Sequence, residues 1–347
     1  MSEATYNLLI TSYIEPEFVE QIRAVSPRLH VIYEPDMLPK PRYASDHTNT
    51  MQRTPEQQQR WDTLVGQADI LFDFDYTHID TLPERATKAR WVQASSAGIG
   101  QLVRRRGLAE RMPNTIFTTA SGIHAQPLAE FCLLAMLMSS RDLRTIQQGQ
   151  AAHRWQRFGA TDLEGRTLGI IGVGNIGKQV ARMARAVGMR VIGNKRTTQG
   201  VDPASLHLDA LYSAQQLPEL LGQSEYLILI APHTDETEKF IGEKELALLP
   251  RGAYLINIGR GQTVDEPALI AALQRGQLSG AALDVTAVEP LPADSPLWDM
   301  PNVLISPHSA ATTDRENARL VRLFCENLRR FLAGEPLENV LDIELLY

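Results

Sequence analysis

Short apolar runs alternate with amphipathic stretches along the first third of the chain. Between the first two runs, Phe18, Ile22 and Val25 recur at helical spacing and predict a helix over residues 17–25. Strands that alternate with helices in this way are typical of a parallel sheet with helices on both faces. We predict the strands of this first sheet at residues 8–10, 29–33, 68–74, 91–94 and 115–117.

A second alternating series of strands and helices begins at Thr167. Its strands are six, the number that a complete doubly wound dinucleotide-binding domain needs. A helix is expected at about residues 316–333, after the last of them, so we expect it to pack back on the first domain. The strands of the second series are predicted at residues 168–171, 190–193, 226–230, 253–258, 281–285 and 303–305.

Two other stretches need an assignment. The segment PKPRYASDHTNTMQRTPEQQQR is polar and contains prolines, so we predict an exposed loop with a helical end. This loop either shapes the binding pocket or is a surface insertion. The most apolar window, residues 128–138, is interrupted by Glu130 and is too short to span a bilayer, so we interpret it as a buried helix.

Composition narrows the classes of partner. The chain has 347 residues and a formal net charge of −7, which makes nucleic acid and anionic membranes poor partners. The two cysteines, Cys132 and Cys325, stand far apart without partners at metal-ligand spacing, which favours a reducing compartment and no metal site. The N-terminal stretch MSEATYNLLITS lacks the basic and apolar regions of a secretion signal, so we expect a cytoplasmic protein.

The segment GVGNIG follows the first strand of the second series and precedes a helical stretch. Gly172, Gly174 and Gly177 fit the pattern G-x-G-x-x-G. In that pattern the first glycine permits a tight turn, the second lets the backbone approach a pyrophosphate, and the third lets helix and strand pack closely. The helix N-terminus then presents free N–H groups to the phosphates. The order of strand, motif and helix predicts a dinucleotide site.

The next strand ends in Asn194, Lys195 and Arg196, where an NAD-selective site would place an acid for the ribose hydroxyl. No acid is present. Lys195 and Arg196 could pair with a 2′-phosphate, so we favour NADP(H) as the cofactor and keep NAD(H) as possible. In the alternative interpretation the two cations are solvated, or Arg196 stacks on the adenine of NAD.

Four stretches together resemble the D-isomer-specific 2-hydroxyacid dehydrogenase family. They are SSAGIG, LGIIGVGNIGKQVARMARAVGMRVIG, LINIGRGQTVDEPALIAAL and GAALDVTAVEPLPADSPLWDMPNVLISPHSA, and the resemblance is strongest over residues 121–311. It implies two doubly wound domains: a flavodoxin-like substrate domain made of residues 1–120 and 312–347, with a Rossmann dinucleotide-binding domain, residues 121–311, inserted in it. The resemblance also implies a homodimer.

The same resemblance implies roles for individual residues. Arg260 corresponds to the substrate-binding arginine, Glu289 to the carboxylate that pairs with the catalytic histidine, and His308 to the acid/base. Ala97 and Gly98 correspond to backbone donors for the substrate carboxylate. The implied cofactor contacts are Gly172, Gly174, Gly177, Asn175 and Ile176 at the pyrophosphate, Pro232, Thr237, Ile258 and His308 along the cofactor path, and Asp284 at the nicotinamide amide.

The chemistry agrees with these roles. Reduction of a 2-oxo acid needs a hydride, a proton for the developing alkoxide and a cation for the carboxylate. Arg260 suits the cation, and His308 suits the proton because imidazole titrates near neutral pH. Glu289 would favour the protonated ring and hold its orientation. Arg260, Glu289 and His308 follow the predicted fourth, fifth and sixth strands of one parallel sheet, whose carboxyl ends form the ligand-binding edge.

We therefore expect an NAD(P)-dependent dehydrogenase that reduces a small 2-oxo acid, such as glyoxylate or hydroxypyruvate, to the D-2-hydroxy acid. The alternative is a dinucleotide-sensing corepressor, which shares the fold and acts through protein contacts. One position departs from the family pattern: SSAGIG has Gly100 where many relatives carry a polar or acidic residue.

Overall fold

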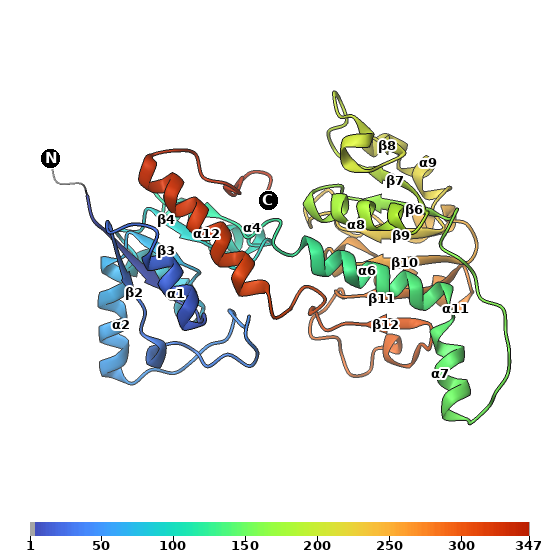
Figure 1. The fold of residues 1–347 in the computed structure, drawn as a ribbon, viewed down its shortest axis with the longest axis horizontal. Coiled ribbons are helices and arrows are strands. Elements are labelled where there is room, and N and C mark those ends of the chain that lie inside the picture. Colours follow the sequence, from blue (N-terminus) through green and yellow to red (C-terminus); the bar gives the residue numbers. More distant parts are fainter. Residues whose placement is uncertain (1–3, 347) are drawn as a thin grey trace. The chain divides into compact units, whose positions relative to one another are not determined.

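The computed structural model describes residues 4–346. The chain divides into two compact units, of which the first comprises residues 1–123 and 312–347 and the second residues 124–311. The first unit is thus built from both ends of the chain, and the two units are drawn in Figure 1.

Within the described residues, the first unit contains a five-stranded parallel sheet with the order β2-β1-β3-β4-β5. This order reverses direction between β1 and β3, as in flavodoxin-like folds. Each predicted strand of this unit is present, although the third is shorter than predicted. The strands are β1 (Tyr6–Ile10), β2 (Leu29–Ile32), β3 (Ile70–Phe72), β4 (Trp91–Gln93) and β5 (Ile116–Thr118).

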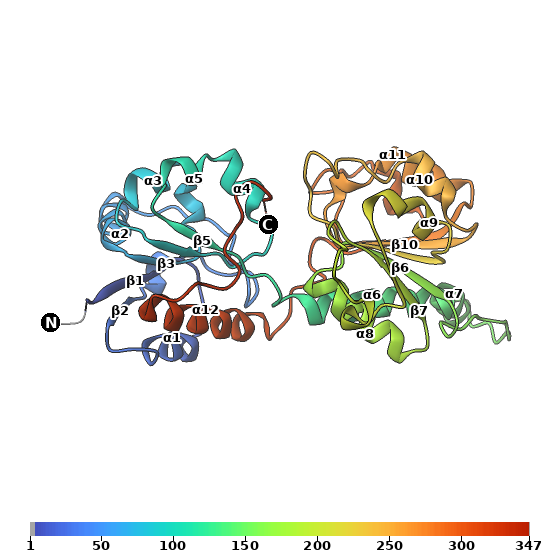
Figure 2. The same ribbon diagram turned by 90° about the horizontal axis from the view of Figure 1, so that it is seen from above.

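Helices cover both faces of this first sheet (Figure 2). On one face lie α1 (Pro16–Arg23) and α12 (Glu316–Ala333), and the apolar side chains of both helices pack on the sheet. The expectation that the last helix returns to the first domain is therefore confirmed. The other face is covered by α2 (Pro55–Gln67), α3 (Leu82–Arg85), α4 (Gly100–Arg105) and α5 (Leu108–Arg111).

The second unit contains a seven-stranded parallel sheet, counted within residues 4–346, with the order β12-β11-β10-β9-β6-β7-β8. The predicted number of six strands is wrong. The missed strand, β8, is an edge strand of three half-buried residues that pairs only with β7. Its apolar run is short and lies between Asp209 and Ser213, so the sequence pattern did not separate it from a loop. The strands are β6 (Thr167–Ile171), β7 (Arg190–Asn194), β8 (Ala210–Tyr212), β9 (Tyr226–Leu229), β10 (Ala253–Asn257), β11 (Leu278–Leu283) and β12 (Val303–Ile305).

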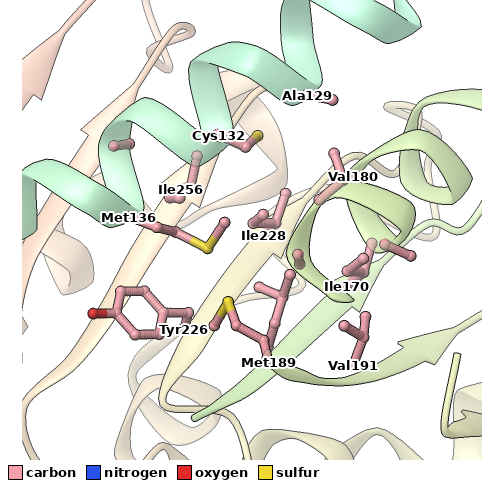
Figure 3. Packing of buried hydrophobic residues seen from close by; sticks show 14 of the residues in the cluster. Ala129, Cys132, Met136, Ile170, Val180, Met189, Val191, Tyr226, Ile228 and Ile256 are labelled. Carbon is pink, nitrogen blue, oxygen red and sulfur yellow. The ribbon is translucent and has the colours of Figure 1, made fainter. Parts of the chain in front are cut away.

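Helices α6 (Ala125–Ser140) and α8 (Asn175–Ala186) cover one face of this second sheet (Figure 2). Figure 3 shows Cys132 and Met136 of α6 facing Ile228 and Ile256 of the sheet. The apolar window at 128–138 is thus a helix packed on a sheet, but Leu134 stays 51% exposed, so only one side of it is buried. The remaining helices of the unit are α7 (Leu143–Ala151), α9 (Leu217–Leu221), α10 (Glu243–Leu248) and α11 (Glu266–Gln274).

Short 3₁₀ turns complete the connections. They are η1 (Pro35–Met37), η2 (Tyr76–Thr81), η3 (Pro203–Leu206), η4 (Ala214–Gln216), η5 (Gly261–Thr263) and η6 (Pro296–Asp299). Among the described residues no helix combines the length and the apolar character that crossing a bilayer requires.

The polar segment before α2 is largely the exposed loop that we predicted, but three of its residues are not on the surface. Its helical end is present as the start of α2, but Ser45, Asp46 and His47 are buried. These residues are buried because they are hydrogen-bonded. His47 forms hydrogen bonds with Ser12 and Asn317. The backbone amide and the guanidinium of Arg42 donate hydrogen bonds to the Asp46 carboxylate. Paired polar groups can be buried at little cost, and hydropathy alone does not report such pairing.

Candidate active site

Three adjacent strands of the second unit deliver the predicted catalytic residues to one edge. β12, β11 and β10 are neighbours in the sheet (Figure 1) and run parallel, so their carboxyl ends meet at the same side. Arg260 follows β10, Glu289 follows β11 and His308 follows β12. Because β8 was missed, these are the fifth, sixth and seventh strands of the unit rather than the fourth, fifth and sixth.

Glu289 and His308 form a direct pair. The distance between Nδ1 of His308 and Oε2 of Glu289 is 2.8 Å, and the backbone amide of Thr286 donates to the other carboxylate oxygen at 3.2 Å. Burial alone would raise the pKa of Glu289. The hydrogen bond and charge of His308, the Thr286 amide and the charge of Arg260 outweigh that effect and lower it. Glu289 is therefore ionised at neutral pH and holds the imidazole through Nδ1.

The imidazole is presented by a strained backbone. His308 has a φ of +53°, in the left-handed region that residues other than glycine rarely adopt. Its amide donates to the carbonyl of Asp284 at 2.9 Å. The buried carboxylate of Asp284 accepts hydrogen bonds from the Ser306 hydroxyl at 2.7 Å and from the Ser309 and Ala310 amides at 2.9 Å each. Asp284 thus fixes the turn that carries His308, a contact that the sequence did not indicate.

Arg260 is half-buried beside this pair of residues. Burial lowers the pKa of its guanidinium, and the charges of Glu289 and Asp284 act in the opposite direction. Its carbonyl oxygen accepts from the Asn257 amide group at 3.1 Å and from the Thr263 hydroxyl at 2.6 Å. Asn257 and Thr263 are polar residues of the quoted NIGRGQT stretch whose structural task sequence reasoning missed.

Close packing also fixes the Arg260 loop. A Cβ atom on Gly261 would lie 1.9 Å from the carbonyl oxygen of Thr286, so only glycine allows the two loops to touch. Thr286 in turn donates its amide to Glu289. Gly261 therefore links the loop of the cation to the loop of the acid/base pair.

The three glycines of GVGNIG have different structural reasons for lacking a side chain. Gly172 has a φ of +95°, and a Cβ there would lie 2.6 Å from the amide nitrogen of Ala231. A Cβ on Gly177 would lie 3.0 Å from the carbonyl oxygen of Gly172. A Cβ on Gly174 would meet no heavy atom within 4 Å, although Gly174 begins α8. The protein's own packing requires the first and third glycines, whereas the space beside the second is open.

The strand after the glycine loop carries the predicted ribose-side residues. The carbonyl of Asn194 accepts from the amides of Gly172 and Val173, and its side chain donates to the carbonyls of Tyr212 and Ser213. Asn194 thus ties the glycine loop to β8. Lys195 is half-buried and Arg196 is exposed, with no carboxylate among residues 194–197.

The other predicted contacts lie in separate places. Asn175 and Ile176 form the first turn of α8, and Ile258 is buried after β10. The hydroxyl of Thr237 donates to the carbonyl of Pro232 at 2.7 Å, which closes that loop on itself. Ala97 and Gly98 belong to the first unit, on the loop between β4 and α4, where the Gly98 amide donates to the Ser96 hydroxyl at 3.3 Å.

Comparison with known proteins agrees with this geometry. The family model "D-isomer specific 2-hydroxyacid dehydrogenase, NAD binding domain" matches residues 133–310. The chain is 34% identical to a glyoxylate reductase of Korarchaeum cryptofilum, over 66% of this chain and 70% of that protein. It is 37% identical to a glyoxylate/hydroxypyruvate reductase B of Pectobacterium carotovorum, over 64% of this chain and 70% of that protein.

The chain belongs to the D-isomer specific 2-hydroxyacid dehydrogenase family. A D-isomer specific 2-hydroxyacid dehydrogenase of Xanthobacter autotrophicus, solved with NADPH and MES, has a similar structure. Its TM-score is 0.78 at 29% identity, and the match covers 99% of this chain and 100% of that one. The predicted fold, a Rossmann domain inserted along the chain in a flavodoxin-like domain, is confirmed.

Membership of the 2-hydroxyacid dehydrogenase family makes the chain an NAD(P)-dependent oxidoreductase that acts on a small hydroxy or oxo acid. The open approach at Gly174 and the N-terminal turn of α8 fit the pyrophosphate of such a cofactor. Within residues 4–346, no group of three or more His, Cys, Asp and Glu side chains is arranged to hold a metal ion.

Proposed function

We propose that the chain is a D-2-hydroxyacid dehydrogenase that reduces a small 2-oxo acid of the glyoxylate or hydroxypyruvate kind, with NADPH preferred over NADH. The observation that carries the proposal is the His308–Glu289 pair at 2.8 Å, on the sheet edge that Arg260 shares. A histidine held by a carboxylate, beside a cation, is the set of groups that reduction of a 2-oxo acid requires.

His308 is the proton donor of this proposal. Its Nδ1 stays bonded to Glu289, so the proton for the substrate leaves from Nε2 and goes to the carbonyl oxygen as that oxygen becomes a hydroxyl. When bound, the nicotinamide cofactor supplies the hydride. Imidazole is then neutral and regains a proton from solvent, which its half-exposed position permits.

Arg260 binds the carboxylate of the substrate and polarises its carbonyl in this proposal. Its guanidinium carries a fixed fork of donors that suits a planar carboxylate. The amides of Ala97 and Gly98 would hold the same carboxylate from the first unit. The names of the two relatives support glyoxylate and hydroxypyruvate as the substrates to try.

The preference for NADPH rests on charge. Lys195 and Arg196 follow β7 where a carboxylate would serve NADH, and two cations there favour a 2′-phosphate. The similar Xanthobacter protein was solved with NADPH, which supports the same preference. Pro232, Thr237, Ile258 and Asp284 remain proposed cofactor contacts.

We also propose a homodimer located in the cytoplasm. The exposed apolar residues Leu134 and Leu137 of α6 and Ile146 of α7 would give a second copy an apolar surface to cover. The oligomeric state follows from sedimentation or light scattering of the purified protein.

The test is an assay of the purified protein with NADPH and with NADH against glyoxylate, hydroxypyruvate and larger 2-oxo acids. We expect turnover of glyoxylate or hydroxypyruvate, a higher kcat/KM with NADPH, and a D-configured product where the product is chiral. A higher kcat/KM with NADH would contradict the role of Lys195 and Arg196. Tight cofactor binding without turnover of any 2-oxo acid would contradict the proposed activity.

A further inference from the structure

A buried polar network at the carboxyl edge of the first unit's sheet has no part in the chemistry described so far. Ser12 follows β1, Asp73 follows β3 and Ser95 follows β4, and all three residues are buried. The strand order reverses between β1 and β3, so Ser12 and Asp73 flank the switch point where such sheets place their ligand sites.

Asp73 holds the loop that leaves β4. Its side chain is fully buried, and Oδ1 accepts the backbone amide of Ser95 at 3.3 Å. The other carboxylate oxygen, Oδ2, is buried and has no hydrogen-bond partner among the described residues. Asp73 has a φ of +70°, a conformation that aspartate and asparagine tolerate better than other residues with a side chain.

His47, in the polar segment that precedes α2, is buried close enough to Asp73 for its charge to lower the pKa of that carboxyl. Nε2 of His47 lies 2.8 Å from Oδ1 of Asn317, and Nδ1 lies 3.0 Å from the Ser12 hydroxyl. The amide group of Asn317 donates to Glu15 and to the carbonyl of Ala44, each at 2.8 Å. Oδ1 of Asn317 is therefore an acceptor, and Nε2 of His47 carries a proton.

The surroundings of Asp73 act on the pKa of its carboxyl in two opposite directions. Burial raises the pKa of Asp73, while the charge of His47 and the hydrogen bonds from Ser95 and Phe74 lower it. A carboxyl in such a place needs its partners fixed, and the partners here are a loop backbone and a histidine locked by Asn317. The network therefore ties the 95–98 loop to the rigid end of β3.

We infer that Asp73 is a positioning residue that holds the 95–98 loop, and with it the amides of Ala97 and Gly98, where the substrate carboxylate binds. The inference rests on the proposed function, which gives those two amides to the substrate. It also gives the segment at residues 42–47 a role, because that segment buries His47 near Asp73.

Asp75 provides a matched comparison. It is a buried acid on the same turn, but it accepts from the Trp61 indole at 3.1 Å and from the Arg85 guanidinium at 2.7 Å, and neither belongs to the 95–98 loop. Asp75→Asn should therefore lower Tm while the KM of the substrate stays within about twofold of the wild type.

The experiment compares Asp73→Gly with Asp73→Asn in the full chain. Glycine tolerates the left-handed conformation and removes the acceptor of the Ser95 amide, whereas asparagine keeps Oδ1 for that amide and removes only the charge. We expect Asp73→Gly to raise KM for glyoxylate about tenfold, with kcat and KM for NADPH within about twofold, and Asp73→Asn to keep KM for glyoxylate within about twofold. Removal of a negative charge near an anion site would by itself lower this KM, so a rise reports positioning.

An unchanged or lowered KM for glyoxylate in a folded Asp73→Gly protein overturns the inference. An equal rise of KM in Asp73→Asn or in Asp75→Asn overturns it too, because loss of the hydrogen bond to Ser95 would then not be its cause. If Asp73→Gly does not fold, Asp73→Ser replaces it: its shorter side chain withdraws the acceptor from the Ser95 amide, and a KM rise of about threefold supports the inference while no rise overturns it. Absence of turnover in the wild-type protein would contradict the proposed function itself, and the inference with it.

Discussion

Gly174 differs from the other glycines of its loop because no contact within the protein excludes a Cβ there. Its φ of −105° lies outside the left-handed region, although its ψ of −150° is not that of a helix or a strand, and we propose that the approach of a phosphate group explains the glycine. We predict that Gly174→Ala keeps the wild-type Tm and raises KM for NADPH about tenfold, which corresponds to about 1.4 kcal/mol.

Gly172→Ala is the control for that prediction. The Cβ would collide with the backbone at Ala231 and the residue has a positive φ, so this variant should lose stability as well as cofactor affinity. Thermal unfolding and a titration of NADPH distinguish the two. A Gly174→Ala protein with wild-type affinity for NADPH would show that no phosphate approaches this glycine.

Glu289 sets the pH range of the reaction. Its pKa is lowered by His308, Thr286 and Arg260 against the effect of burial, so its charge persists below the usual titration range of a carboxyl and is lost only as pH falls through the lowered pKa. In Glu289→Gln that charge is absent at every pH, and the imidazolium loses its stabilising partner.

The kcat for the reduction of glyoxylate should therefore fall at least about tenfold at neutral pH in Glu289→Gln. The ratio of wild-type to variant kcat should decrease as pH falls through the lowered pKa of Glu289, because the wild-type carboxyl then loses its charge too. Rate profiles of both proteins from acid to neutral pH measure this ratio. A ratio near one at neutral pH would contradict the role of Glu289.

At the scale of elements, the site depends on two loops in contact. Gly261 meets the carbonyl of Thr286 so closely that any Cβ must push the loops apart. We predict that Gly261→Ala lowers kcat/KM at least about tenfold, since a displacement of about 1 Å in a catalytic group can cost that much. The variant Gly259→Ala serves as a control on the same loop. A Cβ there would lie 3.0 Å from the carbonyl oxygen of Ala231, so the backbone would need to move less. Equal effects of the two variants would contradict this account.

The elements also show what sequence patterns can predict. Strands with apolar runs, such as β6 and β9, were predicted because their side chains are buried on both faces. β8 was missed because its apolar run is short and half-buried at the edge of the sheet. His308, Arg260 and Glu289 were predicted from the family resemblance, with which their place after neighbouring strands agreed. Asp73 and His47 were missed because their tasks are hydrogen bonds to distant segments, and Asn257 because its task is a hydrogen bond to a loop carbonyl.

Gly100 illustrates a departure that the fold explains. Many relatives carry a polar or acidic residue at this position. A Cβ on Gly100 would lie 2.0 Å from the carbonyl oxygen of Leu346, so the C-terminal segment occupies the space that a side chain would need. The sequence alone contained no sign of this contact, since the two residues lie at distant points of the chain.

At the scale of the whole molecule, the C-terminal helix α12 completes the hydrophobic core of the first unit. Phe324 of α12 is fully buried, with ring centroids 4.9 Å from Phe72 and 5.0 Å from Trp91. We predict that Phe324→Ala destabilises the first unit by about 3–5 kcal/mol. The second unit contains none of these contacts, so NADPH should still bind it.

Calorimetry and an NADPH titration of Phe324→Ala measure both effects. Leu248→Ala, in α10 of the second unit, is the control, because that side chain is 44% exposed and its truncation should change Tm little. If Phe324→Ala destabilises the first unit and also abolishes NADPH binding, then the second unit does not bind NADPH independently of the first.

The most direct test of the central claim is the rate of NADPH oxidation by glyoxylate in the wild-type protein and in His308→Gln. Glutamine keeps a polar side chain beside Glu289 but cannot donate a proton as an acid. The account predicts that kcat falls about 10²–10⁴-fold while the Kd of NADPH, measured by fluorescence, stays within about twofold. Wild-type turnover in His308→Gln would contradict it.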